Sequence, residues 1–214
     1  MPVLTEDKVS GGIGVPPRWN APPGGGGGGG GEPDSSFPIS SKQIATWLLM
    51  TGIAMLFAGL TSAYIVLRGV PTWESLQLPP LVWVNTLFLI ASSLTLELAR
   101  RSVKTDRMAA LRLCLGITAI LGIAFVSGQI MLWRQMTSSG LLLASTLHSS
   151  FFYVLSGIHA VHILGGLIGL ATVSVKAWSG RLSSISFEPL RLCATYWHFM
   201  GGVWLYLILL LVFA

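Results

Sequence analysis

Five long apolar stretches constrain this chain more than any other feature of its sequence. They cover about residues 44–67, 81–98, 109–133, 149–175 and 192–213. A helix needs roughly 20 apolar residues to cross a hydrocarbon layer about 30 Å thick, and each stretch is near or above that length. Because water is absent from that layer, backbone groups must pair within the segment, as they do in a helix. The pattern predicts an all-α fold, an integral membrane bundle of five transmembrane helices.

The composition argues against the soluble classes of protein. Apolar residues make up 52% of the chain and charged residues only 10%, whereas a soluble domain carries about 25% charged residues. The two cysteines, Cys114 and Cys193, form no CxxC pair and no cluster with histidine. The sequence therefore predicts neither a disulfide framework nor a zinc site. A cytosolic enzyme, a disordered chain and a secreted disulfide scaffold are all poor interpretations.

Residues 1–41 differ from the rest and predict a separate unit. They contain a run of eight consecutive glycines, Gly24 to Gly31, with prolines on both sides. Such a run behaves as flexible coil and cannot bury enough apolar surface to become ordered. It lacks the Lys-Ser/Thr ending of a phosphate-binding loop and the apolar run of a signal peptide. We expect a disordered cytoplasmic tail over residues 1–41 and a membrane domain over residues 42–214.

The positions of Lys and Arg predict the orientation in the membrane. Five spans place the N-terminal tail and the second and fourth loops on one side. Eleven of the 13 basic residues fall there: Lys8, Arg18, Lys42, Arg100, Arg101, Lys104, Arg107, Arg112, Lys176, Arg181 and Arg191. Arg68 and Arg134 fall on the other side. Cytoplasmic loops are enriched in basic residues, so the N-terminus should be cytoplasmic and the C-terminus outside. No nucleic-acid partner is expected, because the basic residues form no patch on a folded soluble surface.

Histidines are the most informative polar groups within the predicted spans. His159 and His162 lie three residues apart on one face of the fourth span, His198 lies in the fifth, and His148 lies at the outer end of the fourth. Two histidines at this spacing and a third from a neighbour could hold copper, zinc or haem. Alternatively, the imidazoles form hydrogen bonds between helices or to lipid headgroups. No Cys, Met or carboxylate cluster accompanies them, which favours the second interpretation and predicts no metal site.

Small residues predict close helix packing in the last two spans. Gly157, Gly165 and Gly169 recur at multiples of four in the fourth span. The last two match the small-xxx-small pattern that lets helix backbones approach closely. Gly201 and Gly202 are expected to serve the same purpose in the fifth span. The partner helix could belong to this chain or to another.

Long motifs in three spans resemble a known family. Residues 151–166 read FFYVLSGIHAVHILGG, residues 196–206 read YWHFMGGVWLY, and residues 57–68 read FAGLTSAYIVLR. Together they resemble subunit III of the haem–copper terminal oxidases, the cytochrome c oxidase subunit 3 family, in its bacterial five-helix form. The resemblance covers about residues 42–214.

The resemblance implies a non-catalytic subunit of a proton-pumping oxidase of aerobic respiration. It implies a multi-pass protein of the bacterial plasma (inner) membrane that packs on oxidase subunits I and II, chiefly subunit I. It also implies that the chain binds phospholipid and supports proton uptake and durability during turnover. Haem and copper are then expected in the partner subunits, and no cofactor is expected on this chain. A respiratory supercomplex is compatible with this assignment.

Five residues form the predicted lipid-binding site or interhelical polar network: His159, His162, Glu188, Trp197 and His198. Glu188 is included because family members commonly carry a glutamate upstream of the YWHF motif.

The chain departs from the family at two acidic positions. Thr51-Gly52 stands at or near a Ser-Glu pair of many members, and Gly201 replaces an acidic residue after YWHF. Another group, in this chain or in subunit I, would have to supply what the absent carboxylates do.

Two other classes of protein compete with the oxidase subunit. A haem b membrane anchor would need histidines facing each other across two helices, and only His198 is available opposite His159 and His162. A small multi-pass carrier would need a polar site near the midplane, where only Ser127, Gln129 and the histidines supply polarity. No Asp or Glu lies in the middle of a span, which weakens a transporter or pump with its own proton relay and leaves a passive or substrate-specific carrier open. Both alternatives must treat the long motifs as coincidence.

Overall fold

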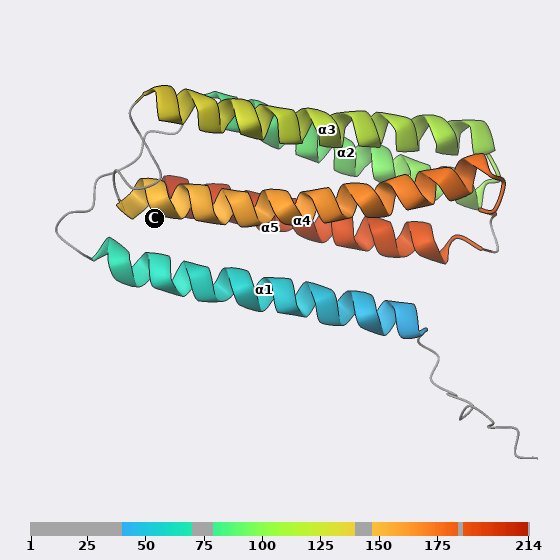
Figure 1. Ribbon diagram of the computed structural model, residues 1–214. Helices are drawn as coiled ribbons and strands as arrows, with labels where there is room; N and C mark the ends of the chain where they lie inside the picture. Colours follow the sequence, from blue (N-terminus) through green and yellow to red (C-terminus); the bar gives the residue numbers. More distant parts are fainter. Residues whose placement is uncertain (1–39, 70–78, 140–146, 184–185, 214) are drawn as a thin grey trace, which may run out of the picture. The chain divides into compact units, whose positions relative to one another are not determined.

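The computed structural model describes residues 40–69, 79–139, 147–183 and 186–213. Within these ranges the chain forms five helices and no strand (Figure 1). The helices are α1 Ser41–Arg68, α2 Leu81–Lys104, α3 Met108–Ser138, α4 Leu147–Trp178 and α5 Glu188–Phe213. All five are long and apolar enough to cross a membrane, and even the 24 residues of α2 extend about 36 Å. The predicted five-span, all-α fold is confirmed.

The helices extend beyond the apolar stretches that predict them. α2 continues from residue 98 to Lys104, α3 from residue 133 to Ser138, and α5 begins at Glu188 instead of residue 192. Polar residues at headgroup depth end the apolar stretch, but the backbone continues its helical hydrogen bonds through them. Basic residues in the last turn of α2 also interact favourably with the helix dipole.

The start of α1 is defined by a capping box. The Ser40 side chain accepts a hydrogen bond from the Gln43 N–H, and the Gln43 side chain accepts one from the Ser40 N–H. Two of the backbone donors that a helix start leaves unpaired are thereby satisfied. The predicted disordered tail lies almost wholly outside the described residues. The cytoplasmic position of the N-terminus remains a prediction from charge.

Four of the helices form a closed ring of contacts, and α1 is attached to it. α2 packs on α3, α3 on α4, α4 on α5, and α5 on α2. Among the described helices, α1 contacts only α4 and α5 (Figure 1). Four principal grooves run along the described helices: one between α1, α4 and α5, one between α1 and α5, one between α2 and α5, and one between α3 and α4.

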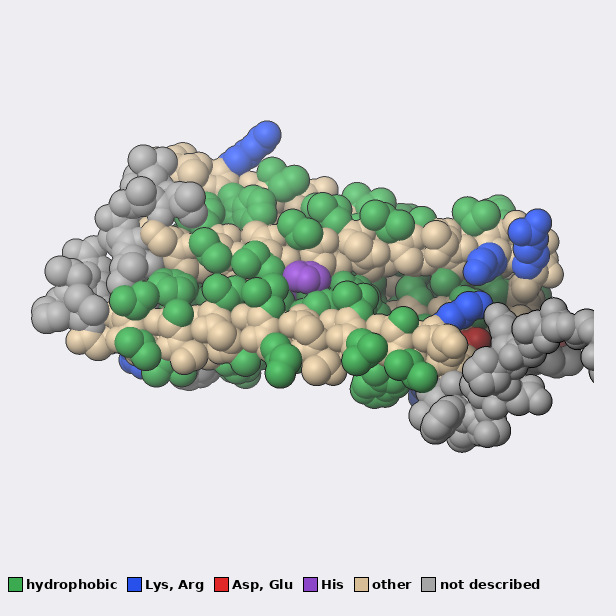
Figure 2. Space-filling view, turned by 60° about the horizontal axis from the view of Figure 1, so that its bottom comes forward, with side chains coloured by type: hydrophobic (Ala, Val, Ile, Leu, Met, Phe, Trp, Pro, Cys, Tyr) green, Lys and Arg blue, Asp and Glu red, His purple; other side chains and the backbone are tan. Residues whose placement is uncertain are grey.

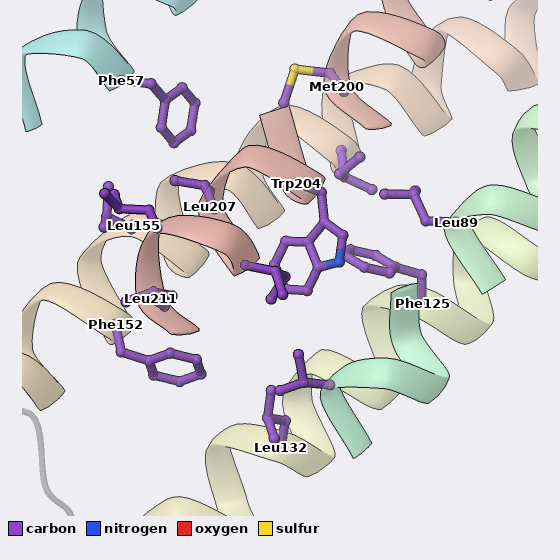
Figure 3. Close-up of a cluster of buried hydrophobic side chains, with 14 of the residues drawn as sticks. Phe57, Leu89, Phe125, Leu132, Phe152, Leu155, Met200, Trp204, Leu207 and Leu211 are labelled. Carbon is purple, nitrogen blue, oxygen red and sulfur yellow. The ribbon is translucent and has the colours of Figure 1, made fainter. Parts of the chain in front are cut away.

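Two tryptophans of α5 anchor the interior of this ring. Trp204 donates from Nε1 to Thr86 Oγ1 at 3.1 Å, and Trp197 donates to Ser92 Oγ at 2.9 Å. Figure 3 shows the Trp204 indole meeting Phe125, whose ring stands at 89° to it with centroids 5.0 Å apart. Buried indoles contribute large apolar area and still require a partner for N–H. These contacts fix how α5 sits on α2 and α3.

Candidate functional site

The predicted site residues occupy several separate environments. His159 and Trp197 lie in the core, at 0% exposure each. His162 lines a groove between α1, α4 and α5. His198 lines a different groove, between α2 and α5. Glu188 begins α5, where its Oε1 accepts a hydrogen bond from Ser40 Oγ.

His159 lies in an aromatic part of the core. Its ring centroid lies 5.1 Å from that of Trp204, 6.0 Å from Phe125 and 6.4 Å from Phe57. Neither ring nitrogen has a hydrogen-bond partner among the described residues. The same is true of the side-chain amides of Asn85 and Gln129, which are also buried.

The three unpartnered side chains lie at one depth in the bundle. A hydrogen bond from Trp133 Nε1 to Ser156 Oγ (3.1 Å) sets the register of α3 against α4. Gln129 lies one turn before Trp133 in α3, and His159 lies about one turn after Ser156 in α4. Because the two helices are antiparallel, this register brings Gln129 level with His159. Asn85 approaches the α3 backbone just before Gln129, which places it at the same level. We name Asn85, Gln129 and His159 the polar layer. The only sign of this layer in the sequence is that each of its residues is a polar residue within an apolar span.

The α1–α4–α5 groove has a volume of about 500 Å³. Gly165, Gly166 and Gly169 of α4 contribute to its lining, and Lys42 and Lys176 lie at one end. Figure 2 shows this side of the bundle, with a hollow between two helices and basic side chains gathered at one end. Most of the remaining lining is apolar. The groove thus combines an apolar trough with two cations at headgroup depth.

His162 and Tyr196 are already hydrogen-bonded inside this groove. His162 Nδ1 lies 2.8 Å from the Ile158 carbonyl oxygen, and Tyr196 donates its hydroxyl proton to the His162 carbonyl at 3.0 Å. Neither Lys42 nor Lys176 forms an ion pair within the described part of the chain. The cations, not the histidine, are therefore the groups left to bind an anion here.

The glycines differ in how closely they are approached. A methyl group added at Gly157, Gly169 or Gly202 would meet no atom within 4 Å. At Gly165 it would lie 3.9 Å from Tyr196, and at Gly201 3.5 Å from Ser93, which is ordinary contact.

The glycines that neighbouring side chains approach most closely lie in α3. The small-xxx-small pattern predicted close packing in α4 and α5 instead. A methyl group at Gly122 would lie 2.9 Å from both Leu167 and Trp197, and one at Gly128 would overlap Asn85. Neither glycine stands in a small-xxx-small pair with another glycine, which is why the pattern missed them.

The histidines do not gather as ligands in the described residues. Across the described ranges, no three His, Cys, Asp or Glu side chains come together as a metal site would require. His198 lines the α2–α5 groove, away from the core position of His159 and from the groove that His162 lines. The facing pair that a bis-histidine haem needs is not formed by these three.

Comparisons with known proteins identify a family for most of the chain. A sequence model of the family described as cytochrome c oxidase subunit III matches residues 43–214. Cytochrome c oxidase subunit 3 of Bacillus subtilis is 30% identical over 173 residues, covering 78% of this chain and 83% of the relative. Subunit 3 of the cytochrome bo(3) ubiquinol oxidase of Pseudomonas aeruginosa is 28% identical over 163 residues, covering 74% and 78%.

The family match covers all five spanning helices and excludes the Gly-rich tail. With bacterial relatives of this kind, the chain is a multi-pass protein of the bacterial inner membrane. The motifs, the five spans and the match over residues 43–214 together show that this chain belongs to the cytochrome c oxidase subunit III family.

Proposed function

We propose that this chain is a non-catalytic subunit of a proton-pumping haem–copper oxidase, packing chiefly on subunit I and holding phospholipid in the α1–α4–α5 groove. Family membership already makes it a subunit III with partner oxidase subunits. The proposal adds that haem and copper reside in subunits I and II. It also adds that bound lipid helps to sustain proton uptake and durability during turnover.

The observation that carries the lipid assignment is the pair of lysines at the end of an apolar groove. Lys176 lies 14 residues beyond His162 on α4, about 21 Å along the axis. That is close to the length of an extended acyl chain, so a tail can lie in the trough while the headgroup meets the lysines. Basic residues at the membrane surface contribute about 1 kcal/mol each to anionic-lipid binding. The expected ligand is an anionic phospholipid in the leaflet that Lys42 and Lys176 face.

Neither alternative class gains support from an observation. A haem b anchor would need a facing pair of histidines, which His159, His162 and His198 do not form. Of the polar residues that a carrier would use, Gln129 and His159 are buried and line neither the α1–α4–α5 nor the α2–α5 groove.

The test is the lipid content of the purified oxidase carrying Lys42→Gln and Lys176→Gln together. Losing about 2 kcal/mol should weaken anionic-lipid binding about 30-fold, so native mass spectrometry should find the bound lipid depleted. The turnover-dependent loss of oxygen consumption should become faster. Arg107→Gln with Arg181→Gln is the matched control, because both are exposed on the same side and line none of the four principal grooves. Equal lipid content in both double variants would contradict the assignment.

A further inference from the structure

The α2–α5 groove, like the α1–α4–α5 groove, has polar residues in its lining. It has a volume of about 390 Å³ and is lined by apolar side chains together with Ser93, Glu97, His198, Gly201 and Gly202. The groove between α1 and α5, by contrast, is lined almost entirely by apolar residues and small residues. The polar groups of the α2–α5 groove therefore require an explanation that lipid tails do not supply.

Two of these polar groups lie deep in the membrane. His198 is exposed and lies ten residues into α5, about 15 Å from Glu188. Ser93 lies near the middle of α2, 12 residues after Leu81 and 11 before Lys104. Neither the His198 ring nor the Ser93 hydroxyl makes a hydrogen bond with any described residue, whereas His162 and Thr172 in the α1–α4–α5 groove both do. Unsatisfied polar groups facing hydrocarbon are costly.

The chemistry of the groove selects its occupant. Acyl chains offer no hydrogen-bonding group, and headgroups remain at the surface, so lipid cannot satisfy His198 at this depth. A transmembrane helix can bring a polar side chain there. Gly202 leaves open space above its backbone and Gly201 only ordinary contact, which permits the close approach that such helices need.

Charges at the end of the groove complement a helix with an acidic group. Glu97 pairs with Arg100 at 2.9 Å and with Arg101 at 3.5 Å. One carboxylate against two guanidinium groups leaves one positive charge, and the Arg101 side chain is 74% exposed. An acidic side chain near the end of a partner helix would neutralise it.

We propose that the α2–α5 groove receives a transmembrane helix of another oxidase subunit. The helix presents a hydrogen-bonding side chain at the depth of His198 and an acidic group near Arg101. This inference rests on the proposed function, because it takes the occupant to be an oxidase partner. Beyond the proposed function, this inference names the face of the chain, the α2–α5 groove, that binds the partner subunit.

The first test places a photo-crosslinking phenylalanine derivative in the groove of the intact complex. Leu94 is 63% exposed and lines the groove, whereas Ile120 of α3 is 68% exposed and does not. Illumination of native membranes should join the Leu94 probe to an oxidase subunit and the Ile120 probe to lipid. If the Leu94 probe reacts only with lipid while the chain still co-purifies with the oxidase, the groove assignment is wrong and the proposed function stands. If the chain does not co-purify with any oxidase subunit, both are wrong.

The second test varies the groove without disturbing the fold. Gly202→Leu fills open space in this groove and also in the α1–α5 groove, which Gly202 lines as well. Ala58→Leu, which adds bulk to the α1–α5 groove alone, and Gly157→Leu, which fills open space on α4, are therefore the two controls. Retention of the chain by the oxidase during detergent washing should fall roughly tenfold for Gly202→Leu and stay unchanged for both controls. His198→Leu should also lower retention, and His198→Gln should restore part of it because an amide still forms hydrogen bonds. Equal retention of His198→Leu and wild type would overturn the polar contact.

Discussion

Asn85 illustrates how closely a single side chain is held within the polar layer. It is fully buried, and its amide lies against the backbone of α3 where Gly128 has no side chain. Protein interiors leave little free volume, so one added methyl group must displace a neighbour. Residue 128 lies within a regular helix, so its backbone conformation does not call for glycine. Glycine is required there because the Asn85 side chain lies against the backbone.

We predict that Gly128→Ala destabilises the chain by about 1–3 kcal/mol, the usual cost of overpacking a core. Gly157→Ala should be neutral or stabilise by up to about 1 kcal/mol, because the added methyl meets open space and alanine favours helix. Unfolding of the purified chain in mixed detergent micelles measures both. Adding Asn85→Ala to Gly128→Ala should recover stability, and the double-mutant cycle isolates this contact. Equal stability of the two glycine variants would show that Asn85 does not lie against residue 128.

At the scale of the elements, hydropathy was sufficient to predict every helix. Each apolar stretch is as long as a membrane is thick, and in hydrocarbon only a helix satisfies the backbone of a single segment. The bounds were less predictable, because the added turns at Lys104, Ser138 and Glu188 are polar and leave no hydropathy signal.

The division of the site among the helices could not be predicted from one segment at a time. The spacing of His159 and His162 places both on one side of α4, and both rings do face Phe57, at 6.4 Å and 6.0 Å. Only the packing of α1, α3 and α5 around α4 decides that His159 is buried and that His162 lines a groove. Groove residues from α2 and α5, such as Ser93 and His198, are likewise far apart in the sequence.

The first turn of α1 offers a prediction at this scale. Ser40 caps α1 and also donates its hydroxyl proton to Glu188, which links the starts of two helices. Ser40→Ala should cost about 1 kcal/mol or more, because a lost N-cap alone has that effect. Faster amide hydrogen exchange in residues 41–46 would report it. Ser41→Ala is the control, since Ser41 is exposed and makes no side-chain hydrogen bond within the described ranges. Identical exchange in the two variants would refute the capping function.

At the scale of the whole molecule, the antiparallel helices bring most of the basic residues to one end of the bundle. Tyr64, near the end of α1, contacts His148, near the start of α4, at 3.2 Å. The opposite ends of these two helices carry Lys42 and Lys176, which meet in one groove. The charge asymmetry seen along the sequence is therefore an asymmetry between two ends of the folded bundle, as the positive-inside rule requires.

This asymmetry predicts which end faces the cytoplasm, and two exposed positions test it. With Cys114 and Cys193 replaced by alanine, Ser139→Cys after α3 should react with a membrane-impermeant maleimide in right-side-out vesicles. Thr105→Cys, after α2, should react only once the vesicles are opened. The two introduced cysteines are each other's control, because residues 105 and 139 are both exposed and differ only in the side of the membrane on which they are predicted to lie. The reverse labelling pattern would contradict the orientation and would move the lysines of the α1–α4–α5 groove to the outer leaflet. The expected pattern places them in the inner leaflet, where anionic phospholipid is available to bind.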